Sequence, residues 1–399
     1  MINTETEELQ MLPWGNPDYI NNPYPWYRKA RQEFPVFQDT DGTYVITRYE
    51  DVVKFGKLQS LSIVDPAWVP KGPWAALSST VLSIDPPLHT QIRRRSNKWF
   101  TPKLVNKWVE AAEAFVNARL DEISSGETFD ANMLLGVGPS HAAMCNALQL
   151  PANDFEPVIM SMHKTMAALS ATAGDTENAA ATAAFDYMFS RVEEMLHYKR
   201  ENPGDGMVDA LIELSDKGEI TQEELIQTVV LFWGSGGHNP SYIVSSGIAH
   251  FAQNPEVYQI YRQHPEHRSA IINELFRLYP PELSFARYAT EELIIGDKTI
   301  VPGERVRFML DSANRDESVF TDPDKLDIMR PPETAQNVSF GLGPHACAGQ
   351  IISRALADTI FGALSKRVAN FTITATPVMD NSDRSRAYVN LPIAVEKIA

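Results

Sequence analysis

The sequence predicts a mainly α-helical fold with a minor content of β-strand, in a single domain over residues 1–399. Three observations support this prediction. Most of the chain follows helical periodicity, strand-like alternation is confined to short segments, and no linker, repeat or low-complexity tract divides it. A hydrophobic fraction of 44% with 22% charged residues is also sufficient for a large core and is untypical of a disordered chain.

The net charge and the cysteine count exclude several classes of protein. A net charge of -16 argues against a nucleic-acid partner and against adsorption to anionic membranes. Two cysteines are too few for a disulfide framework or a cysteine-rich zinc site. The start, MINTETEELQ, has no signal-peptide pattern, and the apolar stretch 225–252 is interrupted by Gly, His, Asn and Pro. We therefore expect a soluble cytoplasmic protein without a membrane segment.

The first half of the chain is predicted to be largely helical. A stretch rich in Pro, Trp and Tyr turns into a helix at about Pro25. The pair Asp41-Gly42 is a turn signal before TYVITRY, which alternates like a strand. Further helices are expected over residues 50–58, 103–124, 153–172, 178–200 and 206–216.

The second half begins with a clear helix start. Thr221 and Glu224 have the spacing of a capping box, which predicts a helix from Thr221. Further helices are expected over residues 255–263 and 266–279, and from Ala348 to about Val368. Short strands are expected at 293–296 and 304–309, and the tail from FTITATPVMD to YVNLPIAVEKI alternates like a hairpin.

The segment SFGLGPHACAG, residues 339–349, combines three glycines, a proline and Cys347. A helix is predicted to begin directly after the cysteine, and free N–H groups at a helix start favour a thiolate with a lowered pKa. The glycines at 341, 343 and 349 allow the backbone to approach a large flat group. A thiolate that binds iron requires these features. The other cysteine, Cys145, lies in the apolar run AAMCNALQL and is interpreted as a core residue.

The segment from Phe340 to Gly349 matches every fixed position of the pattern Phe-Gly-x-Gly-x-His-x-Cys-x-Gly. It resembles the cysteine-ligand loop of the cytochrome P-450 superfamily of haem-thiolate monooxygenases, in its soluble bacterial type. The resemblance implies the cytochrome P-450 fold, with haem b between a long distal helix and the cysteine loop and helix. It implies that Cys347 is the axial ligand of the iron and that Phe340, Gly341, His345 and Gly349 also belong to the haem-binding loop.

Three charged residues resemble the structural ion network of that family. Glu274-Leu-Phe-Arg277 matches its Glu-x-x-Arg motif, and Arg330 resembles the arginine that completes the network. Taken alone, a pair with this spacing is also common on exposed helix surfaces. The resemblance extends from about Asn22 to Glu396 and is weakest over residues 60–80 and 150–200, which cover the substrate in the family.

Four basic residues are expected to bind the haem propionates. His89 and Arg93 match a His-x-x-x-Arg motif, and their spacing puts both on one helix face. The resemblance implies that Arg287 and His345 are the other two partners. Four basic groups converging on two carboxylates is physically reasonable, because a buried charge must be paired.

The helix from Thr221 departs from the family pattern Ala-Gly-x-(Glu/Asp)-Thr. In LFWGSGGHNPSYIV, Gly236-Gly237 stand for Ala-Gly, and His238, Asn239 and Pro240 follow. Both the acid and the alcohol are therefore missing. In the family these two groups organise the water that delivers protons for oxygen activation. Pro240 also removes a helical hydrogen bond to residue 236, which predicts a widened, kinked helix.

Several mechanisms remain open for this helix, with candidate catalytic residues Gly237, His238, Asn239, Pro240 and Ser241. Protons could arrive through His238, Ser241, water at the kink or a substrate hydroxyl, so that ordinary monooxygenation or hydroxylation proceeds. The substrate could instead lose two hydrogens and couple to itself, as in phenol or aryl crosslinking. A peroxide-driven reaction, a haem sensor without turnover, and a substitution without functional consequence also remain open. His238 itself is open to interpretation as a packed residue.

The resemblance also implies a pocket and protein partners. The expected substrate is a small organic secondary metabolite or, for coupling, an aromatic or tyrosine-containing peptide. Electrons are expected from a ferredoxin and its reductase, because the chain has no room for a fused redox domain. Arg94, Arg95 and Lys98 are predicted to face outward, either as a docking patch or as a solvated surface. The expected pocket residues are Phe232, Trp233, Gly236, Asn239, Leu283, Phe285, Tyr388 and the loop from Val64 to Trp74.

Overall fold

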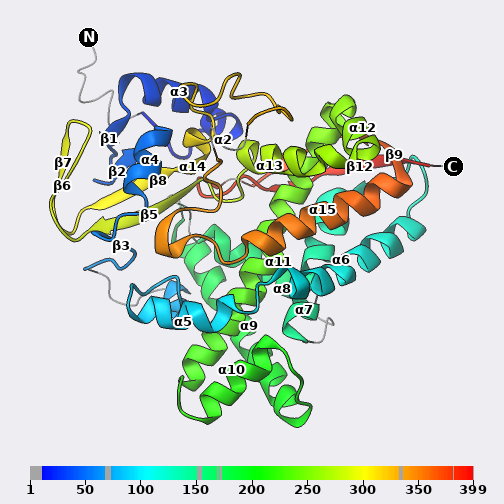
Figure 1. Cartoon of the computed structure of the whole chain (residues 1–399), viewed down its shortest axis with the longest axis horizontal. Coiled ribbons are helices and arrows are strands. Elements are labelled where there is room, and N and C mark those ends of the chain that lie inside the picture. The colour runs from blue at the N-terminus through cyan, green and yellow to red at the C-terminus, as the bar shows by residue number, and fades with distance from the viewer. Residues whose placement is uncertain are drawn as a thin grey trace.

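A computed structural model of the chain describes residues 11–67, 73–150, 155–168, 170, 173–331, 336–380 and 382–398. In this part the fold is mainly α with minor β, as predicted (Figure 1). The strands β1, β2, β3, β5 and β8 lie at the left of the view, β9 and β12 lie at the right near the C-terminus, and most helices fill the centre and right. Part of the predicted pocket loop, residues 68–72, lies outside the described residues. Within the described residues, none of the helices combines the length and apolar character that a membrane crossing requires.

The main sheet joins the start of the chain to its second half. It contains β1 (Val36–Gln38), β2 (Tyr44–Ile46), β8 (Arg305–Met309), β5 (Ser284–Ala289) and β3 (Leu61–Ser62), in that order. The pair β2 and β8 is parallel, and the other neighbours are antiparallel. The predicted turn at Gly42 joins β1 to β2, and its φ of 81° explains the glycine.

The helical body follows the predicted order, with boundaries shifted by a few residues. Helices α2 (Pro17–Asn21), α3 (Tyr24–Glu33) and α4 (Tyr49–Phe55) accompany the first strands. The central helices are α5 (Leu88–Asn97), α6 (Pro102–Glu122), α7 (Gly138–Leu148), α8 (Phe155–Ala167), α9 (Asp175–Glu201), α10 (Met207–Asp216) and α11 (Gln222–Gln253). The last helices are α12 (Pro255–Gln263), α13 (Arg268–Leu278), α14 (Leu310–Ala313) and α15 (Gln350–Arg367).

Shorter elements complete the fold. The segments η1 (Pro73–Leu77), η3 (Pro265–His267) and η4 (Gly343–His345) are 3₁₀ turns, and η2 (Asn132–Val137) is a π-helical turn that leads into α7. The predicted hairpin in the tail consists of β9 (Val368–Ile373) paired with β12 (Pro392–Lys397), which also pairs with β4 (Thr128–Asp130). Two small pairs are β6 (Leu293–Ile295) with β7 (Lys298–Ile300), and β10 (Val378–Met379) with β11 (Tyr388–Asn390).

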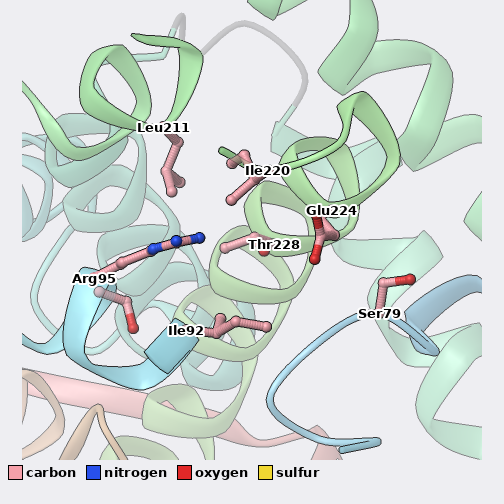
Figure 2. Close-up of a pocket in the computed structure, with 8 residues that line it drawn as sticks. Ser79, Ile92, Arg95, Leu211, Ile220, Glu224 and Thr228 are labelled. Atoms are coloured by element: carbon pink, nitrogen blue, oxygen red, sulfur yellow. The ribbon is translucent and has the colours of Figure 1, made fainter. Parts of the chain in front are cut away.

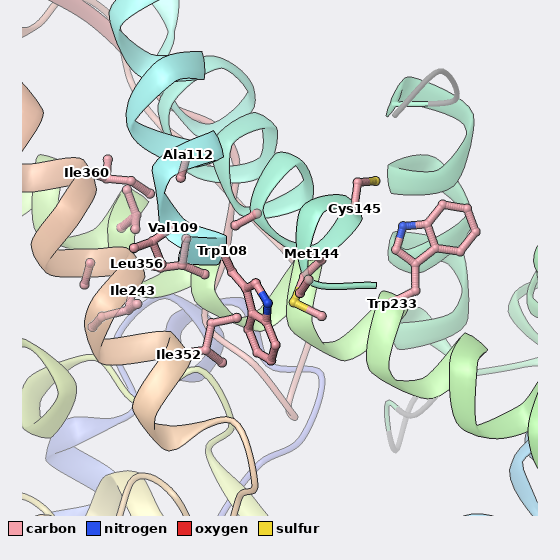
Figure 3. Packing of buried hydrophobic residues seen from close by; sticks show 14 of the residues in the cluster. Trp108, Val109, Ala112, Met144, Cys145, Trp233, Ile243, Ile352, Leu356 and Ile360 are labelled. Atoms are coloured by element: carbon pink, nitrogen blue, oxygen red, sulfur yellow. The ribbon is translucent and has the colours of Figure 1, made fainter. Parts of the chain in front are cut away.

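The long helix α11 crosses the centre of the molecule (Figure 1) and packs against α7 and α15. Residues of α6 belong to the same core (Figure 3). The predicted capping box of α11 is confirmed: the Thr221 hydroxyl accepts from the Glu224 N–H at 3.0 Å, and the Thr221 N–H donates to the Glu224 carboxylate at 2.6 Å. The helix continues through Pro240 to Gln253, so the proline does not end it. The predicted widening stays a prediction.

Among the elements that were not predicted are β5 and α7. The strand β5 precedes the strands expected at 293–296 and 304–309, and its burial does not alternate regularly along SFARYA. The helix α7 is buried on nearly every side, because α6 and α11 cover it, so its sequence carries no amphipathic pattern. In both cases tertiary packing decided the structure, and a periodic signal was missing from the sequence.

Candidate functional site

A cavity of about 600 Å³ lies inside the molecule and is lined by α11, β5 and the segment that leads into α15. Leu231, Phe232 and Asn239 line it from α11, and Phe340 and Cys347 line it from the segment before α15. A second pocket, between α5, α10 and α11, has a volume of about 20 Å³ (Figure 2). It has room for about one water molecule, so the large cavity is the candidate for an organic ligand.

The Cys347 thiol lines the cavity and is accessible from it. A backbone hydrogen bond of 2.8 Å from the Cys347 N–H to the Phe340 carbonyl closes the loop that precedes the cysteine. Gly341 has a φ of 67°, so this position favours glycine, whereas a Cβ at Gly349 would lie at an ordinary contact distance of 3.6 Å from the Cys347 sulfur. Gly343 does not line the cavity, and a Cβ there would approach the Lys57 Cα to 3.0 Å. The prediction that all three glycines face one flat ligand is therefore wrong for Gly343.

The pKa of the Cys347 thiol differs from the sequence prediction. Burial raises it, and the N–H of Gly349 and the charge of Arg93 oppose this only in part. The prediction of a lowered pKa is thus wrong for the protein alone. The enclosing protein atoms outweigh the helix start, since α15 begins at Gln350 rather than directly after the cysteine.

The four predicted basic residues come together from three separate segments. Arg93 of α5, Arg287 of β5 and His345 of η4 line the cavity. The ring of His89 is 4.1 Å from that of His345, measured between centroids. The Arg93 guanidinium donates to the Ala346 carbonyl, which ties α5 to the loop beside the cysteine.

Two of these basic groups have unusual surroundings. Both ring nitrogens of His89 are buried, and neither has a hydrogen-bond partner among the described residues. Burial, with the charges of His345 and Arg93, lowers the pKa of His89 to about 4. His345 Nε2 lies 3.2 Å from the Asp85 carboxylate. A carboxylate entering here could accept a hydrogen bond from the N–H of His89, which fits a ligand with carboxylates.

The three residues predicted as an ion network contact one another in the structure. Arg277 Nε and Nη2 donate to the two Glu274 oxygens at 2.7 and 2.8 Å. Arg330 Nε lies 3.2 Å from the same carboxylate. Burial raises the pKa of Glu274, but the bonds from Arg277 and the charge of Arg330 outweigh it and hold the pKa below its ordinary value.

The predicted catalytic residues on α11 divide between two faces. His238 and Asn239 line the cavity, whereas Gly237, Pro240 and Ser241 do not. The Ser241 hydroxyl donates to the His238 carbonyl at 2.6 Å, which occupies its proton within the helix. Ser241 therefore does not face the cavity directly, and its role as a proton route stays a prediction. The Asn239 Oδ1 is buried and has no hydrogen-bond partner in the described part of the chain.

His238 lies in a cluster that the sequence analysis did not predict. The Tyr242 hydroxyl, one helical turn later, hydrogen-bonds His238 Nε2, and the ring of His163 from α8 packs edge-on at 4.7 Å. His238 is buried, but His163 is partly exposed. Burial, followed by the charge of His163, lowers the pKa of His238 well below its ordinary value. The spacing of four between residues 238 and 242 is the sequence signal that could have predicted the first of these contacts.

The predicted pocket residues are only partly correct. Phe232, Gly236, Asn239 and Phe285 line the cavity, as do Val64 and Trp74 at the ends of the predicted loop. A Cβ at Gly236 would lie 2.4 Å from the Met144 sulfur, so a larger residue here would displace the flexible Met144 side chain.

Three predicted pocket residues do not line the cavity: Trp233, Leu283 and Tyr388. Trp233 follows Phe232 on the helix and therefore points to another side, into the core beside Cys145 (Figure 3). Leu283 is buried, and Tyr388 packs against the main core.

Charged residues of the cavity wall and of α5 complete the picture. Glu282 and Arg384 line the cavity and were missed, because nothing in their sequence surroundings marks them. Arg94 and Lys98 are exposed as predicted, but Arg95 is partly buried and reaches the Glu219 carbonyl at 3.4 Å. The prediction that Arg95 faces outward is therefore wrong.

Comparisons with known proteins agree on one family. A family model described as Cytochrome P450 matches residues 20–391. The chain is 27% identical over 391 residues to Nocardicin C N-oxygenase of Nocardia uniformis subsp. tsuyamanensis, covering 94% of this chain and 95% of that protein. It is 28% identical over 346 residues to Mycinamicin VIII C21 methyl hydroxylase of Micromonospora griseorubida, covering 85% and 86%.

A solved structure shows the same fold. The structure of P450BioI in complex with an acyl carrier protein ligated to hexadec-9Z-enoic acid superposes with a TM-score of 0.88. The match covers 95% of this chain and 100% of that chain, at 22% sequence identity. At this identity the likeness establishes the architecture alone.

Proposed function

This chain belongs to the cytochrome P450 family, and we propose that it oxidises a small organic molecule in the cavity beside Cys347. The family binds haem b through a cysteine thiolate, and the chain is a monooxygenase of this type. One observation carries the proposal. A cavity of about 600 Å³ has the Cys347 thiol and the basic residues Arg93, Arg287 and His345 on its walls, together with Asn239 of α11.

The residues present fit haem b. Cys347 is the proposed iron ligand, and Phe340, Gly341 and Gly349 form the loop that would hold the ring. The proposed propionate partners are His89, Arg93, Arg287 and His345, and the unpartnered His89 nitrogens support this assignment. When bound, the haem supplies the activation of oxygen, and its iron favours the thiolate despite the raised pKa of the free thiol.

The proposed reaction is hydroxylation or a related monooxygenation of a secondary metabolite. One atom of oxygen enters the substrate, and the other leaves as water with two electrons and two protons. The two relatives support this class, because they are named for N-oxygenation of nocardicin C and hydroxylation of mycinamicin VIII. A ferredoxin and its reductase are the proposed electron donors, with exposed Arg94 and Lys98 as docking residues. The cytoplasmic location stays a prediction.

Protons are proposed to reach the cavity through His238. The Tyr242 hydroxyl also forms a hydrogen bond with the Ser385 side chain. When the Tyr242 O–H donates to His238 Nε2, the proton of the neutral histidine is on Nδ1. His238 Nδ1 is buried and has no hydrogen-bond partner among the described residues, so it can hold a proton beside the cavity. The partly exposed His163 packs edge-on against the same ring, and we propose that it continues this route toward the surface.

Oxidative coupling of aromatic rings is the second candidate. Two hydrogens leave the substrate and a bond forms between its rings, while one O2 is reduced to two waters by these two hydrogens together with two electrons from the donor and two protons. The observation that favours it is the pair Asn239 and Pro240 in place of the acid and the alcohol. Asn239 cannot donate a proton at a useful pKa, and Pro240 has neither a hydroxyl nor an N–H.

The first test concerns the iron ligand. The reduced protein with carbon monoxide is expected to show the thiolate-type absorption, and Cys347→Ser is expected to abolish it because serine cannot supply the thiolate. Cys145→Ser is the matched control, since Cys145 is buried in the core, and it should keep the spectrum. A thiolate-type spectrum that survives in Cys347→Ser would show that the ligand is assigned wrongly.

The second test concerns proton delivery. His238→Phe keeps the ring volume but removes the proton, so product formed per electron should fall by roughly tenfold or more while peroxide release rises. The exposed His197→Phe is the control. Replacing Asn239-Pro240 by Asp-Thr should restore the product formed per electron in the His238→Phe background. An unchanged product yield per electron in His238→Phe would eliminate this route.

A further inference from the structure

Glu282 and Arg384 form a charged pair on the wall of the cavity. We propose that this pair binds the zwitterionic head group of the substrate, an ammonium and a carboxylate of the α-amino-acid type, attached to a bulky apolar body. The inference rests on the proposed oxidation in this cavity and adds the class of substrate.

The backbone fixes both residues beside each other. Glu282 comes just before β5, and Arg384 lies in the segment between β10 and β11. The Leu283 N–H donates to the Arg384 carbonyl at 2.8 Å, and Glu282 forms an antiparallel bridge with Ser385. Two separate segments therefore present opposite charges to one place on the cavity wall.

The pair leaves its hydrogen-bonding capacity largely unused. Arg384 Nη2 lies 3.6 Å from Glu282 Oε2, which is beyond a normal N–H···O bond. Glu282 Oε2 and Arg384 Nε are buried and have no hydrogen-bond partner in the described residues. The side chains are 27% and 22% accessible, and both line the cavity. Charges kept from water without hydrogen bonds are costly, and such costs are typical of binding sites rather than of structural pairs.

A zwitterion suits this pair better than a ligand with one charge. An ammonium can donate to the Glu282 carboxylate while an adjacent carboxylate accepts from the Arg384 guanidinium. Both protein charges then gain hydrogen bonds, and the total charge of the site does not change. An amine or an acid alone would pull one partner away and leave the other without compensation.

The other charged residues of the cavity wall differ from this pair. Asp65 accepts from the Ala67 N–H at 2.8 Å, and Arg93, Arg287 and His345 belong to the proposed haem site. Arg305 also leaves its Nε without a hydrogen-bond partner among the described residues, but its acidic neighbour, Asp41 at 3.8 Å, does not line the cavity. Glu282 and Arg384 therefore present an acidic and a basic group to the cavity at one place.

The rest of the cavity supplies the surface for an apolar body. Trp74 and Phe185 meet edge to face at 5.5 Å on its lining. Other apolar lining residues are Leu77, Phe100, Met162, Met188 and Phe232. Aromatic rings and flexible methionines are well suited to a ring-containing group of variable shape.

The test begins with the wild-type ferric holoprotein and four matched probes. O-benzyl-L-tyrosine is a zwitterion with a bulky aromatic body. Its N-acetyl derivative is an anion, its methyl ester is a cation, and the N-acetyl methyl ester is neutral. Soret-shift titrations should show that the zwitterion binds about tenfold to a hundredfold more tightly than each of the other three. Equal or weaker binding of the zwitterion would overturn the inference without use of any variant.

The variants assign the preference to the two residues. Glu282→Gln should remove the preference for the zwitterion over the N-acetyl anion, because only the ammonium contact is lost. Arg384→Gln should remove the preference over the methyl ester, because only the carboxylate contact is lost. Arg305→Gln changes the same type of charge in the same cavity and should leave both preferences intact. Loss of both preferences in Arg305→Gln would contradict the assignment. Retention of both preferences in Glu282→Gln and Arg384→Gln would contradict it as well.

The carbon monoxide spectrum separates this inference from the proposed function. A thiolate-type spectrum with binding of the neutral probe but not of the zwitterion would overturn the head-group site and leave the proposed oxidation intact. Absence of the thiolate-type spectrum from the wild-type protein would overturn the proposed function, whichever probes bind.

Discussion

Two groups of carboxylate and guanidinium side chains differ in how they are built. One is centred on Glu274 in α13, and the other on Glu282, shortly after this helix. In the first, the Glu274 carboxylate receives two bonds from Arg277, at 2.7 and 2.8 Å, and a third contact from Arg330. In the second, Glu282 and Arg384 approach each other only to 3.6 Å, which is too long for a hydrogen bond.

The surroundings of the two groups explain the difference. The remaining N–H groups of Arg277 donate to the carbonyls of Asn314, Pro323 and Lys325, so the buried charge is fully satisfied. The Glu282 group faces the cavity instead. The pKa of Glu274 is held below its ordinary value, whereas burial raises the pKa of Glu282 against the opposing charge of Arg384. The same residue types therefore stabilise the fold in one place and remain available to a ligand in the other.

The largest expected effect is in the first group. Glu274→Gln leaves the buried Arg277 and Arg330 charges without compensation, so the free energy of unfolding should fall by about 3–5 kcal/mol. Urea titration of the holoprotein, followed by circular dichroism, measures it. Glu113→Gln breaks an exposed contact with Lys366 and, as the control, should change it by less than about 1 kcal/mol. A loss as small as the control's would mean that the network is not structural.

The second group should respond much less. Glu282→Gln replaces a carboxylate that lies 3.6 Å from Arg384 and receives no hydrogen bond from it, so the free energy of unfolding should stay within about 1 kcal/mol of the wild type. The same urea titration measures it, beside Glu274→Gln. A loss comparable to that of Glu274→Gln would make both groups structural and would remove the comparison.

The sequence predicted those features that depend on short spacing. The capping box at Thr221, the loop around Cys347 and the pair of Glu274 and Arg277 each lie within a few residues, so local pattern was sufficient. The same holds for most helices, whose periodicity is strong. Arg330 was found only through the resemblance to a family, because nothing local ties it to Glu274.

The features that the sequence did not predict depend on contacts between distant segments. Glu282 and Arg384 meet because the start of β5 and the segment before β11 lie side by side. His163 meets His238 because α8 packs on α11. Trp233 was expected in the pocket from the resemblance to the family, but it lies in the core. Each of these positions depends on tertiary packing, which local spacing does not encode.

The smallest expected effect is on the pH dependence of the free energy of unfolding, to which Glu274 and Glu282 should contribute with opposite sign. The folded pKa of Glu274 lies below its ordinary value of 4.5, so its stabilisation is complete above pH 4.5 and is lost as the pH falls through the folded pKa. The folded pKa of Glu282 lies above 4.5, so its contribution is present below pH 4.5 and is lost as the pH rises through the folded pKa. Urea titrations over a pH series, each with the matching Gln variant subtracted, should therefore give two curves of opposite slope. Two curves of equal slope would show that Glu282 is stabilised as a charge, like Glu274, and that its pair with Arg384 is already satisfied without a ligand.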